Sequence, residues 1–447
     1  MEKSRNAITE GVIWKQLLFF FFPILVGTFF EQLYNTIDAI IVGQYVGTQA
    51  LAAVGSTGSL INLLVGFFVG LSSGASVIIS HFYGANDKEG VSRSVHTSIA
   101  LAIAGGLILT IIGIVIAPMC LKAMGIPMDI YDYALEYTQI YFLGMIASMI
   151  YNMGSGILRA IGDSKRPLYF LMISCIVNII LDLLFVVVFK MEVAGVGIAT
   201  VLSQVVSALL ALYVLIKTED SYKLVLSKIR FSMHELKRIV YIGLPTGLQS
   251  VMYSLSNIII QSSINVFGTI TIASWAAYGK IDSLFWMIMS AFGVSITTFV
   301  GQNFGAGKYQ RVKDSVKVCL KMAMGTAVAL SVILFFFGEP FSHLFSTDPA
   351  VIDMTTEILQ FLTPFYFTYV CVEILSGAIR GTGEAVKPMV ITCFGVCVLR
   401  IVWILVIVPF FPSFKMIQFS YPLTWSVTSI MFIIYYLKGN WLKKEDK

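Results

Sequence analysis

FFFFPILVGTFFEQLYNTIDAIIVG, residues 19–43, is long and apolar enough to cross a bilayer, yet it contains Thr28, Glu31, Asn35 and Asp38. These polar residues are three or four positions apart, so on a helix they lie on one face. The bilayer core offers no water to a carboxylate, and a polar face persists there only against other protein or a wet cavity. Asp38 is therefore the first candidate for a functional residue.

Two interpretations of this polar face remain open. Glu31 and Asn35 either join neighbouring helices by hydrogen bonds or line the path of an ion or substrate. Asp38 either lies among the lipid headgroups or is an intramembrane acid. We favour the intramembrane position, because apolar residues flank Asp38 on both sides, and such acids mark ion or substrate paths.

The composition is that of a membrane protein with many spans. Hydrophobic residues make up 57% of the 447 residues and charged residues 12%, with a mean hydropathy of +0.85, whereas soluble domains are about a quarter charged. Apolar runs of roughly 17–25 residues recur about twelve times. They lie near residues 16–43, 50–80, 91–116, 131–158, 167–188, 194–216, 239–266, 271–301, 312–337, 353–380, 388–409 and 417–438. Little of the chain is left for a soluble catalytic or nucleotide-binding domain.

Basic residues are distributed unevenly between the two expected sides of the membrane. The net charge is +5, and with both termini in the cytoplasm 24 of the 30 Lys and Arg residues fall in cytoplasmic segments or at cytoplasmic ends of spans. This bias predicts a multi-pass protein of the cell membrane with an even number of spans and both termini in the cytoplasm.

No metal centre or cofactor is indicated. The six cysteines are scattered in or beside the expected spans without metal-ligand spacing, so we interpret them as packing residues. The four histidines, His81, His96, His234 and His343, are not clustered, and there is no Walker A loop or Ser/His/Asp arrangement. We therefore expect no enzymatic activity and no cofactor.

An internal duplication relates the two halves of the chain. HFYGA at 81–85 resembles QNFGA at 302–306, an offset of 221 residues. The same offset relates further pairs: Val91/Val312, Ser94/Ser315, Val95/Val316, Gly156/Gly377, Arg159/Arg380, Gly162/Gly383 and Pro167/Pro388. Pro23 and Pro245 pair one residue out of step. So many matches at one register indicate two copies of one unit.

Each copy holds six spans, and an even number means that both copies insert the same way up. The sequence thus predicts an all-α membrane protein with twelve transmembrane helices in two six-helix pseudo-symmetric lobes around a central cavity. We expect the first lobe at residues 1–216, a basic cytoplasmic linker at 217–238 and the second lobe at 239–447.

Two glycine patterns are interpreted as structural. Gly66, Gly70 and Gly74 recur every four residues and let a neighbouring helix approach closely. The motif Arg-x-x-Gly at 159–162 and 380–383 suits the cytoplasmic end of a helix, where a cation favours the dipole and a glycine ends the helix.

Oxygen-bearing side chains recur in the first copy. Asn178 and Asp182 are four residues apart on the fifth span, hence on one face, and Thr200 lies near the start of the sixth. Together with Asp38 they offer two carboxylates, an amide oxygen and a hydroxyl. Such ligands suit a small cation, or a proton shared between two acids, since like charge and burial both disfavour full ionisation.

The second copy lacks these acids. Asn178 and Asp182 correspond to Leu399 and Trp403, and Asp38 corresponds to Ile260 at the proline register. Residues needed only for helix packing would be expected in both copies. The asymmetry therefore favours a dedicated cation or proton site in the first lobe.

Other polar residues lie in or near expected spans. Lys280, Asp282, Glu373 and Arg400 lie within second-copy spans, and we interpret them as a buried ion-pair network in preference to a second coupling site. A set that could line an amphipathic cavity comprises Tyr34, Gln249, Tyr253, Asn257, Gln261, Met145 and Met149. Plain helix packing is the more common role for such aromatic and Met residues.

Several stretches resemble the multidrug and toxic compound extrusion (MATE) family. They are YNTIDAIIVG at 34–43, ALAAVG at 50–55, GQNFGAG at 301–307 and RGTG at 380–383. The resemblance covers essentially the whole chain. It implies a V-shaped pair of lobes that opens alternately to either side, and antiport of organic cations and other amphipathic drugs against Na⁺ or H⁺.

The resemblance also implies a ligand set. Family members with a cation site in the first lobe use a first-span Asp, a fifth-span Asn-x-x-x-Asp and a sixth-span Thr, which match Asp38, Asn178, Asp182 and Thr200. The branch that uses second-lobe acids has a carboxylate on the seventh span. On the seventh span this chain has only the amides Gln249, Asn257 and Gln261. The same branch has a second carboxylate on the tenth span, and Glu373 is out of register with it. We therefore do not expect a second-lobe sodium site.

We expect a multidrug efflux antiporter that exchanges Na⁺ or H⁺ for small amphipathic or cationic substrates. The alternative is a flippase or exporter of lipid-linked or polysaccharide precursors, for which we would expect more cationic residues in the cavity. A membrane-embedded enzyme lacks a recognisable catalytic set, and a purely structural protein would not need acids in one lobe only. The expected partners are the substrate and the lipid bilayer; we expect no nucleic acid and a monomer.

Overall fold

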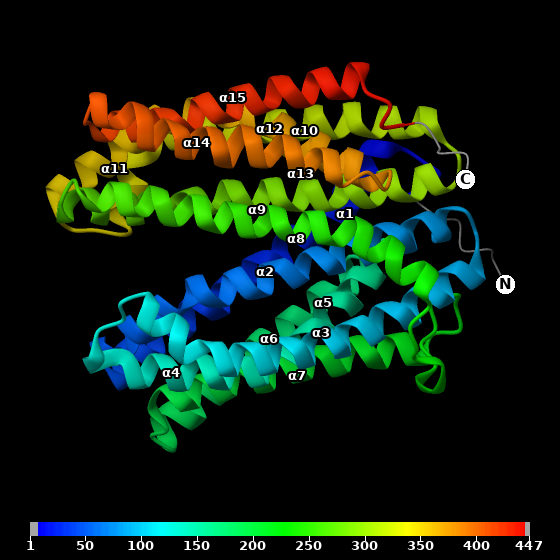
Figure 1. The fold of residues 1–447 in the computed structure, drawn as a ribbon, viewed down its shortest axis with the longest axis horizontal. Coiled ribbons are helices and arrows are strands. Elements are labelled where there is room, and N and C mark those ends of the chain that lie inside the picture. Colours follow the sequence, from blue (N-terminus) through cyan, green and yellow to red (C-terminus); the bar gives the residue numbers. More distant parts are fainter. Residues whose placement is uncertain (1–7, 443–447) are drawn as a thin grey trace. The chain divides into compact units, whose positions relative to one another are not determined.

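The computed structural model describes residues 8–442, and the regular elements of this part are helical (Figure 1). Ten helices are long and apolar enough to span a membrane, and the pair Met128–Leu143 and Met145–Ala160, bent by 50°, adds an eleventh. The helix Met233–Asn265 is equally long but more polar. Within the described residues the twelve-span, all-α prediction is confirmed.

The helices of the first half follow the expected spans closely. They are α1 Ile13–Ile41 with the π-helical segment Val42–Val46, α2 Thr48–Gly84, α3 Lys88–Ala123, α4 Met128–Leu143, α5 Met145–Ala160, α6 Lys165–Asp182 with the π-helical segment Leu183–Val188, and α7 Glu192–Lys217.

The second half repeats this order. Its helices are α8 Met233–Asn265, α9 Thr269–Gly305, α10 Tyr309–His343, α11 Pro349–Leu362, α12 Tyr366–Gly381, a span made of α13 Val386–Thr392 and α14 Leu399–Val402 with π-helical segments between and after them, and α15 Phe414–Lys438. Both α2/α9 and α5/α12 have bounds that differ by the predicted 221 residues. The duplication is therefore confirmed in the fold.

The duplicated Arg-x-x-Gly motif ends a helix in both halves, as expected. Gly162 and Gly383 each have φ of +97°, a backbone conformation that side chains rarely adopt. Their N–H groups donate to the carbonyls of Arg159 and Arg380 at 2.9 Å. Glycine is required at both positions because the chain turns away from the helix there.

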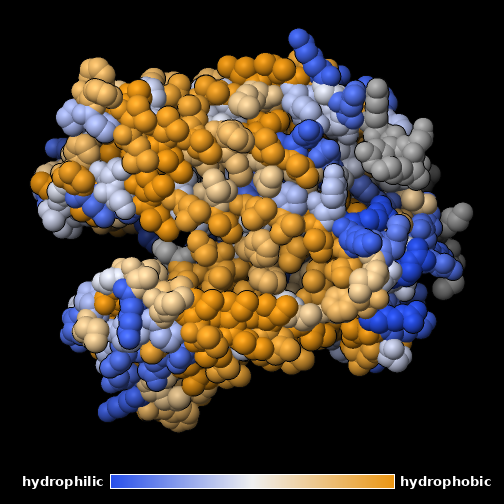
Figure 2. All heavy atoms as spheres, in the orientation of Figure 1, coloured by the Kyte–Doolittle hydropathy of each residue, from blue (hydrophilic) through white to orange (hydrophobic). Residues whose placement is uncertain are grey.

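Close helix packing at glycine is confirmed for α2 and α8. A Cβ atom at Gly70 would lie 2.5 Å from Gly247 Cα, and one at Gly74 would lie 2.7 Å from Gly243 N. Gly66 is less crowded, because its Cβ would meet only Ser250 Cβ at 3.5 Å. On the face shown in Figure 2, hydrophobic residues cover most of the middle of the helices, and hydrophilic residues gather toward their ends.

Contacts divide the chain into two units. One runs from Phe19 to Ser250, and the other comprises the described residues up to Leu18 and those from Val251 onward. The expected linker, 217–238, thus packs with the first unit. Of the basic residues behind the predicted orientation, Lys3, Arg5, Lys443, Lys444 and Lys447 lie outside the described residues.

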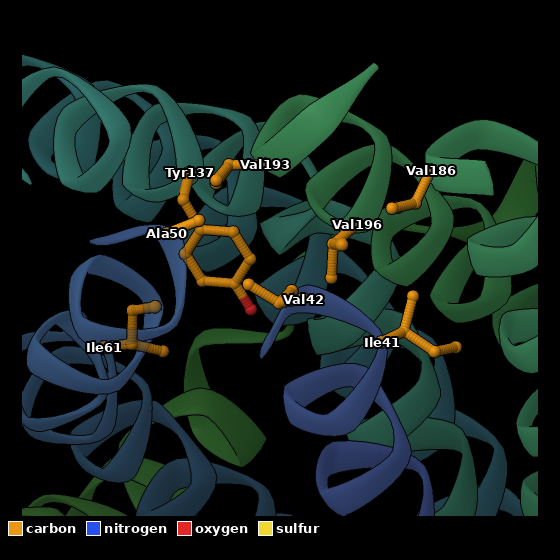
Figure 3. Packing of buried hydrophobic residues seen from close by; sticks show 8 residues of the cluster. All are labelled: Ile41, Val42, Ala50, Ile61, Tyr137, Val186, Val193 and Val196. Atoms are coloured by element: carbon orange, nitrogen blue, oxygen red, sulfur yellow. The ribbon is translucent and has the colours of Figure 1, made fainter. Parts of the chain in front are cut away.

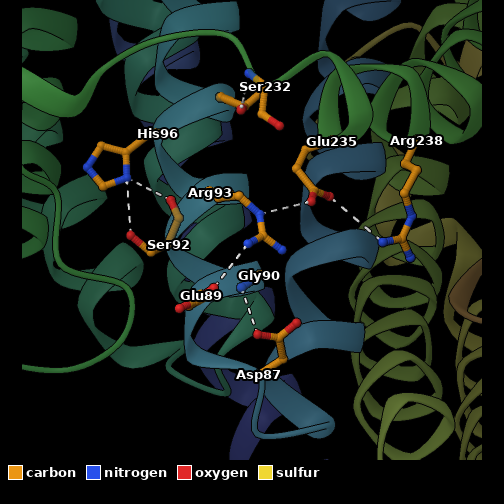
Figure 4. A network of polar contacts seen from close by, with 10 residues as sticks. Asp87, Glu89, Gly90, Ser92, Arg93, His96, Ser232, Glu235 and Arg238 are labelled. Atoms are coloured by element: carbon orange, nitrogen blue, oxygen red, sulfur yellow. Dashed lines mark hydrogen bonds and ion pairs between the residues drawn. The ribbon is translucent and has the colours of Figure 1, made fainter.

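The linker is attached to the first turns of α3 by hydrogen bonds and ion pairs. The backbone N–H of Val225 donates to His96 Nε2 at 3.0 Å, and that of Ser232 donates to Thr97 Oγ1 at 3.1 Å. Buried Glu235 pairs with Arg93 at 3.5 Å and with Arg238 at 3.8 Å (Figure 4). These contacts explain why the linker and the start of α8 belong to the first unit.

The segment before α1 is held in the second unit by Arg311. Its guanidinium donates to the backbone carbonyls of Ile8, Glu10 and Gly11 at 2.9–3.2 Å, and Lys308 Nζ donates to Thr9 O at 2.9 Å. Ile8 and Thr9 are buried. Arg311 therefore fixes the start of the first span.

Arg311→Ala is expected to loosen this segment without unfolding the helices. Hydrogen bonds from a charged donor are each worth about 1.5–3 kcal/mol, so amide exchange in the peptide containing residues 8–11 should accelerate about tenfold or more. Hydrogen–deuterium exchange with mass spectrometry measures this rate. The matched control is Lys313→Ala, since Lys313 is exposed on the same helix; equal exchange in the two variants would contradict the assigned role.

Candidate functional site

The first unit contains two acids on different helices, each close to a short π-helical segment. Asp38 lies on α1, four residues before the π-helical segment Val42–Val46, and Asp182 is the last residue of α6, directly before the π-helical segment Leu183–Val188. Short π-helical segments inside α-helices are frequent at functional sites. The second half has a π-helical segment, Trp403–Ile407, at the corresponding place but no acid.

The structure brings together all four residues predicted for the site. The side chains of Asp182, Asn178 and Thr200 lie near the Asp38 carboxylate. The Thr200 hydroxyl lies 3.4 Å from Asp38 Oδ2 and 3.0 Å from Val196 O. The four side chains are 0–4% exposed, so the cluster is a buried assembly from α1, α6 and α7.

Most oxygens of this cluster lack a hydrogen-bond partner. Within the described residues, Asp38 Oδ1, both carboxylate oxygens of Asp182 and both polar atoms of Asn178 are buried without one. The ion pairs of the described residues do not include Asp38 or Asp182 either. Unsatisfied buried carboxylates are costly, so the arrangement favours a bound cation or a proton.

The donor set fits a small hard cation. Carboxylate, amide and hydroxyl oxygens are the ligands that such ions prefer, and the cluster supplies all three kinds. Asp38, Asn178, Asp182 and Thr200 would hold the ion. The same pair of acids, side by side and without a basic partner, also suits one shared proton.

Tyr137 on α4 belongs to the site but was not predicted. It interacts with Asp38, Asp182 and Thr200, and its ring packs in a buried cluster with Val42 and other apolar residues (Figure 3). The hydroxyl oxygen points toward Val42 in that view. Several tyrosines lie between positions 131 and 141, and neither spacing nor composition distinguishes Tyr137 from the others.

Other polar residues of α1 donate hydrogen bonds within their own helix, as Thr28 does to the backbone carbonyl of Ile24 at 3.1 Å. Asn35 Nδ2 donates to the backbone carbonyl of Glu31 at 2.9 Å, within its own helix. Glu31 and Asn35 are exposed side chains. Glu31 lies within range of an electrostatic interaction with Arg159 of α5. The partly buried Tyr34 lies within such range of Glu31 and Asp38.

Of the predicted cavity residues on α8, Tyr253 has a specific contact. Its hydroxyl lies 3.3 Å from that of Tyr369, which donates to Glu373 Oε2 at 3.4 Å. Gln249 is partly buried and Asn257 is exposed. Glu373 also interacts with Arg380 through charge.

The other expected members of that set are distributed differently. Gln261 Nε2 donates to Asn265 within the same helix at 2.8 Å, whereas Met145 and Met149 are buried. The Met residues therefore pack in the helix bundle.

The expected ion-pair network is not assembled among Lys280, Asp282 and Arg400. Lys280 is exposed, and the ion pairs between described residues do not include any of the three. Arg400 donates to Thr424 Oγ1 at 2.8 and 3.3 Å, and its guanidinium carbon lies 4.0 Å from the ring centre of Tyr421.

Comparison with known proteins gives one family. The family model MatE matches the chain twice, over residues 23–184 and 245–406. The chain is 26% identical over 446 residues to the probable multidrug resistance protein YpnP of Bacillus subtilis (strain 168), covering 97% of each chain. It is 24% identical to an FAD transporter of Shewanella oneidensis, covering 87% of each.

Solved structures show the same fold. A MOP superfamily transporter from Pyrococcus furiosus Vc1 superposes with a TM-score of 0.92 at 23% identity, covering 99% of this chain and 100% of that one. An outward-facing multidrug resistance MATE family transporter gives a TM-score of 0.92 at 24% identity, with the same coverage.

Proposed function

Because this chain belongs to the MATE (MatE) family of membrane transporters, we propose that it is an antiporter that exports organic cations and other amphipathic drugs in exchange for Na⁺ or H⁺. The observation that carries the proposal is the buried cluster of Asp38, Asn178, Asp182 and Thr200, whose carboxylate and amide oxygens largely lack partners among the described residues. The proposal places the transporter in the cell membrane as a monomer with both termini in the cytoplasm.

Each residue of the cluster has a separate role in the proposed coupling. Asp38 and Asp182 come from helices α1 and α6, so occupation of both acids by one ion or proton would draw those helices together. Thr200 and Asn178 supply neutral oxygens, and the apolar residues around Tyr137 exclude water from one side. Occupation would change the affinity of the first unit for the substrate, and the substrate would change the ion affinity by the same factor.

The substrate class rests on the family and on relatives named for multidrug resistance. In the first unit, the polar and aromatic side chains of Tyr34 and Gln249 are partly buried, which suits amphipathic compounds. Neither the cluster nor the named relatives favour a lipid-linked or polysaccharide precursor as the substrate. The efflux experiment below also tests that alternative.

Ethidium efflux tests the proposal. Cells or proteoliposomes with the wild-type chain should expel ethidium when a Na⁺ or H⁺ gradient is imposed separately, and the gradient that supports efflux identifies the coupling ion. Liposomes without protein are the control. A wild type that moves no dye under either gradient would contradict multidrug antiport, and uptake of a fluorescent lipid-linked glycan would then be measured in the same vesicles.

A further inference from the structure

The second unit contains its own buried acid, in surroundings unlike those of the first. Asp282 lies on α9, about three and a half turns from the start of that helix, and its side chain is 8% exposed. Tyr366 of α12 donates its hydroxyl to Oδ1 at 2.5 Å, and Trp286 of α9 donates Nε1–H to Oδ2 at 2.6 Å. Each carboxylate oxygen therefore accepts one short hydrogen bond.

No cationic side chain balances Asp282 among the described residues. Lys280 is two positions along α9 and exposed, so it does not share a face with Asp282. Buried Arg400 is directed to Thr424 and to the face of Tyr421, and Arg380 interacts with Glu373. The ion pairs of the described chain do not include Asp282.

The groups that face Asp282 are almost all aromatic. Tyr278 and Trp286 come from α9, and Tyr366 comes from α12 with its ring stacked on Phe285 at 4.1 Å. Trp425 of α15 lies 6.2 Å from Trp286 and from Tyr366, measured between ring centres. Such a shell provides two tyrosine hydroxyls but none of the amide or further carboxylate oxygens that a metal cation prefers.

An isolated ionised carboxylate in a low-dielectric interior is expensive, and a proton is the one counter-charge that needs no further ligand. We infer that Asp282 is a proton-binding group of the second unit, which takes up and releases one proton between Tyr366 and Trp286. Its use in drug export rests on the proposed antiport, but the binding of the proton does not.

The hydrogen bonds around Asp282 can form with both its ionised and its protonated state. With Asp282 ionised, Tyr366 and Trp286 both donate to it. Uptake of one proton at Oδ1 converts the carboxylate to a carboxylic acid, and the Tyr366 hydroxyl then rotates to accept from Oδ1 and donate toward the hydroxyl of Tyr278, with which it interacts. The Tyr278 hydroxyl is buried and has no other partner among the described residues. Trp286 continues to donate to Oδ2.

The fluorescence of Trp286 reports the protonation of Asp282. A neutral carboxylic acid in contact with an indole quenches the indole fluorescence more strongly than a carboxylate does. In detergent-solubilised protein, tryptophan emission should change in one step as the pH is varied. Asp282→Asn and Trp286→Phe should each lose that step, whereas Asp38→Asn should keep it. Size-exclusion chromatography at each pH confirms that the variants stay folded.

Tyr366→Phe is the second variant and leaves the acid in place. The ionised carboxylate loses a donor, so the step should persist with its midpoint moved to higher pH. A step that survives in Asp282→Asn, a wild type without a step over the pH range in which it is folded, or an unmoved midpoint in Tyr366→Phe would overturn the inference. Failure of ethidium efflux would leave this titration unaffected, so the two proposals fail separately.

Discussion

Asp182→Asn is expected to lower ion-driven ethidium efflux strongly, toward the passive rate, while leaving the protein folded. Asparagine has nearly the same shape as aspartate but carries no charge, so the buried cluster loses one of its two acids. Coupling between two ligands is typically worth about 5–150-fold in affinity, and efflux should fall by a comparable factor toward the passive rate. Efflux from energised vesicles measures this effect.

The matched control is Asp132→Asn, the same chemical change at an exposed acid of α4. It should keep wild-type efflux. Thr200→Val should give an intermediate loss, because it removes a hydroxyl beside Asp38 but neither acid. Undiminished driven efflux in Asp182→Asn would exclude Asp182 from the coupling site.

Gly70→Ala is expected to destabilise the first unit strongly for so small a change. The added methyl would lie 2.5 Å from Gly247 Cα and 2.9 Å from the backbone carbonyl carbon of Thr246, so α2 and α8 must separate. Overpacking of this kind costs about 1–3 kcal/mol and occasionally more. Thermal unfolding of the solubilised protein should show a midpoint lower by several degrees.

Gly66→Ala is the control one turn earlier on α2. Its methyl would make an ordinary contact with Ser250 Cβ at 3.5 Å, and alanine is the better helix former by about 1 kcal/mol. The unfolding midpoint should therefore stay level or rise slightly. An equal loss of stability in the two variants would mean that the close approach of α2 and α8 does not cause the destabilisation by the added methyl group.

The fold was predictable from sequence because lipid restricts the options. A long apolar run in a bilayer has to be a helix, and two copies of a pattern 221 residues apart predict matching helices. The boundaries of the units were not predictable in the same way. Linker residues such as Glu235 look like solvated polar positions in the sequence, and only the folded chain shows Glu235 buried beside Arg93.

The candidate site was predicted in part for a geometric reason. Asn178 and Asp182 are one helical turn apart, so the sequence places them on one face. Asp38 and Thr200 were added because they are oxygen-bearing residues of other first-lobe spans, and the resemblance to the family implies the same four residues. Tyr137 approaches the acids from α4 through the packing of helices, which no spacing encodes. Asn35 shows the opposite case, since this polar residue on the predicted face donates to the backbone carbonyl of Glu31 in its own helix.

The reciprocal flux of the ion tests the central claim most directly. In proteoliposomes without any ion gradient, a gradient of tetraphenylphosphonium should drive movement of radioactive Na⁺ or of protons in the opposite direction, because coupling acts both ways. The account predicts this ion flux in the wild type and its loss in Asp38→Asn and Asp182→Asn. Substrate movement without any ion flux in the wild type, or an ion flux that persists in both variants, would contradict it.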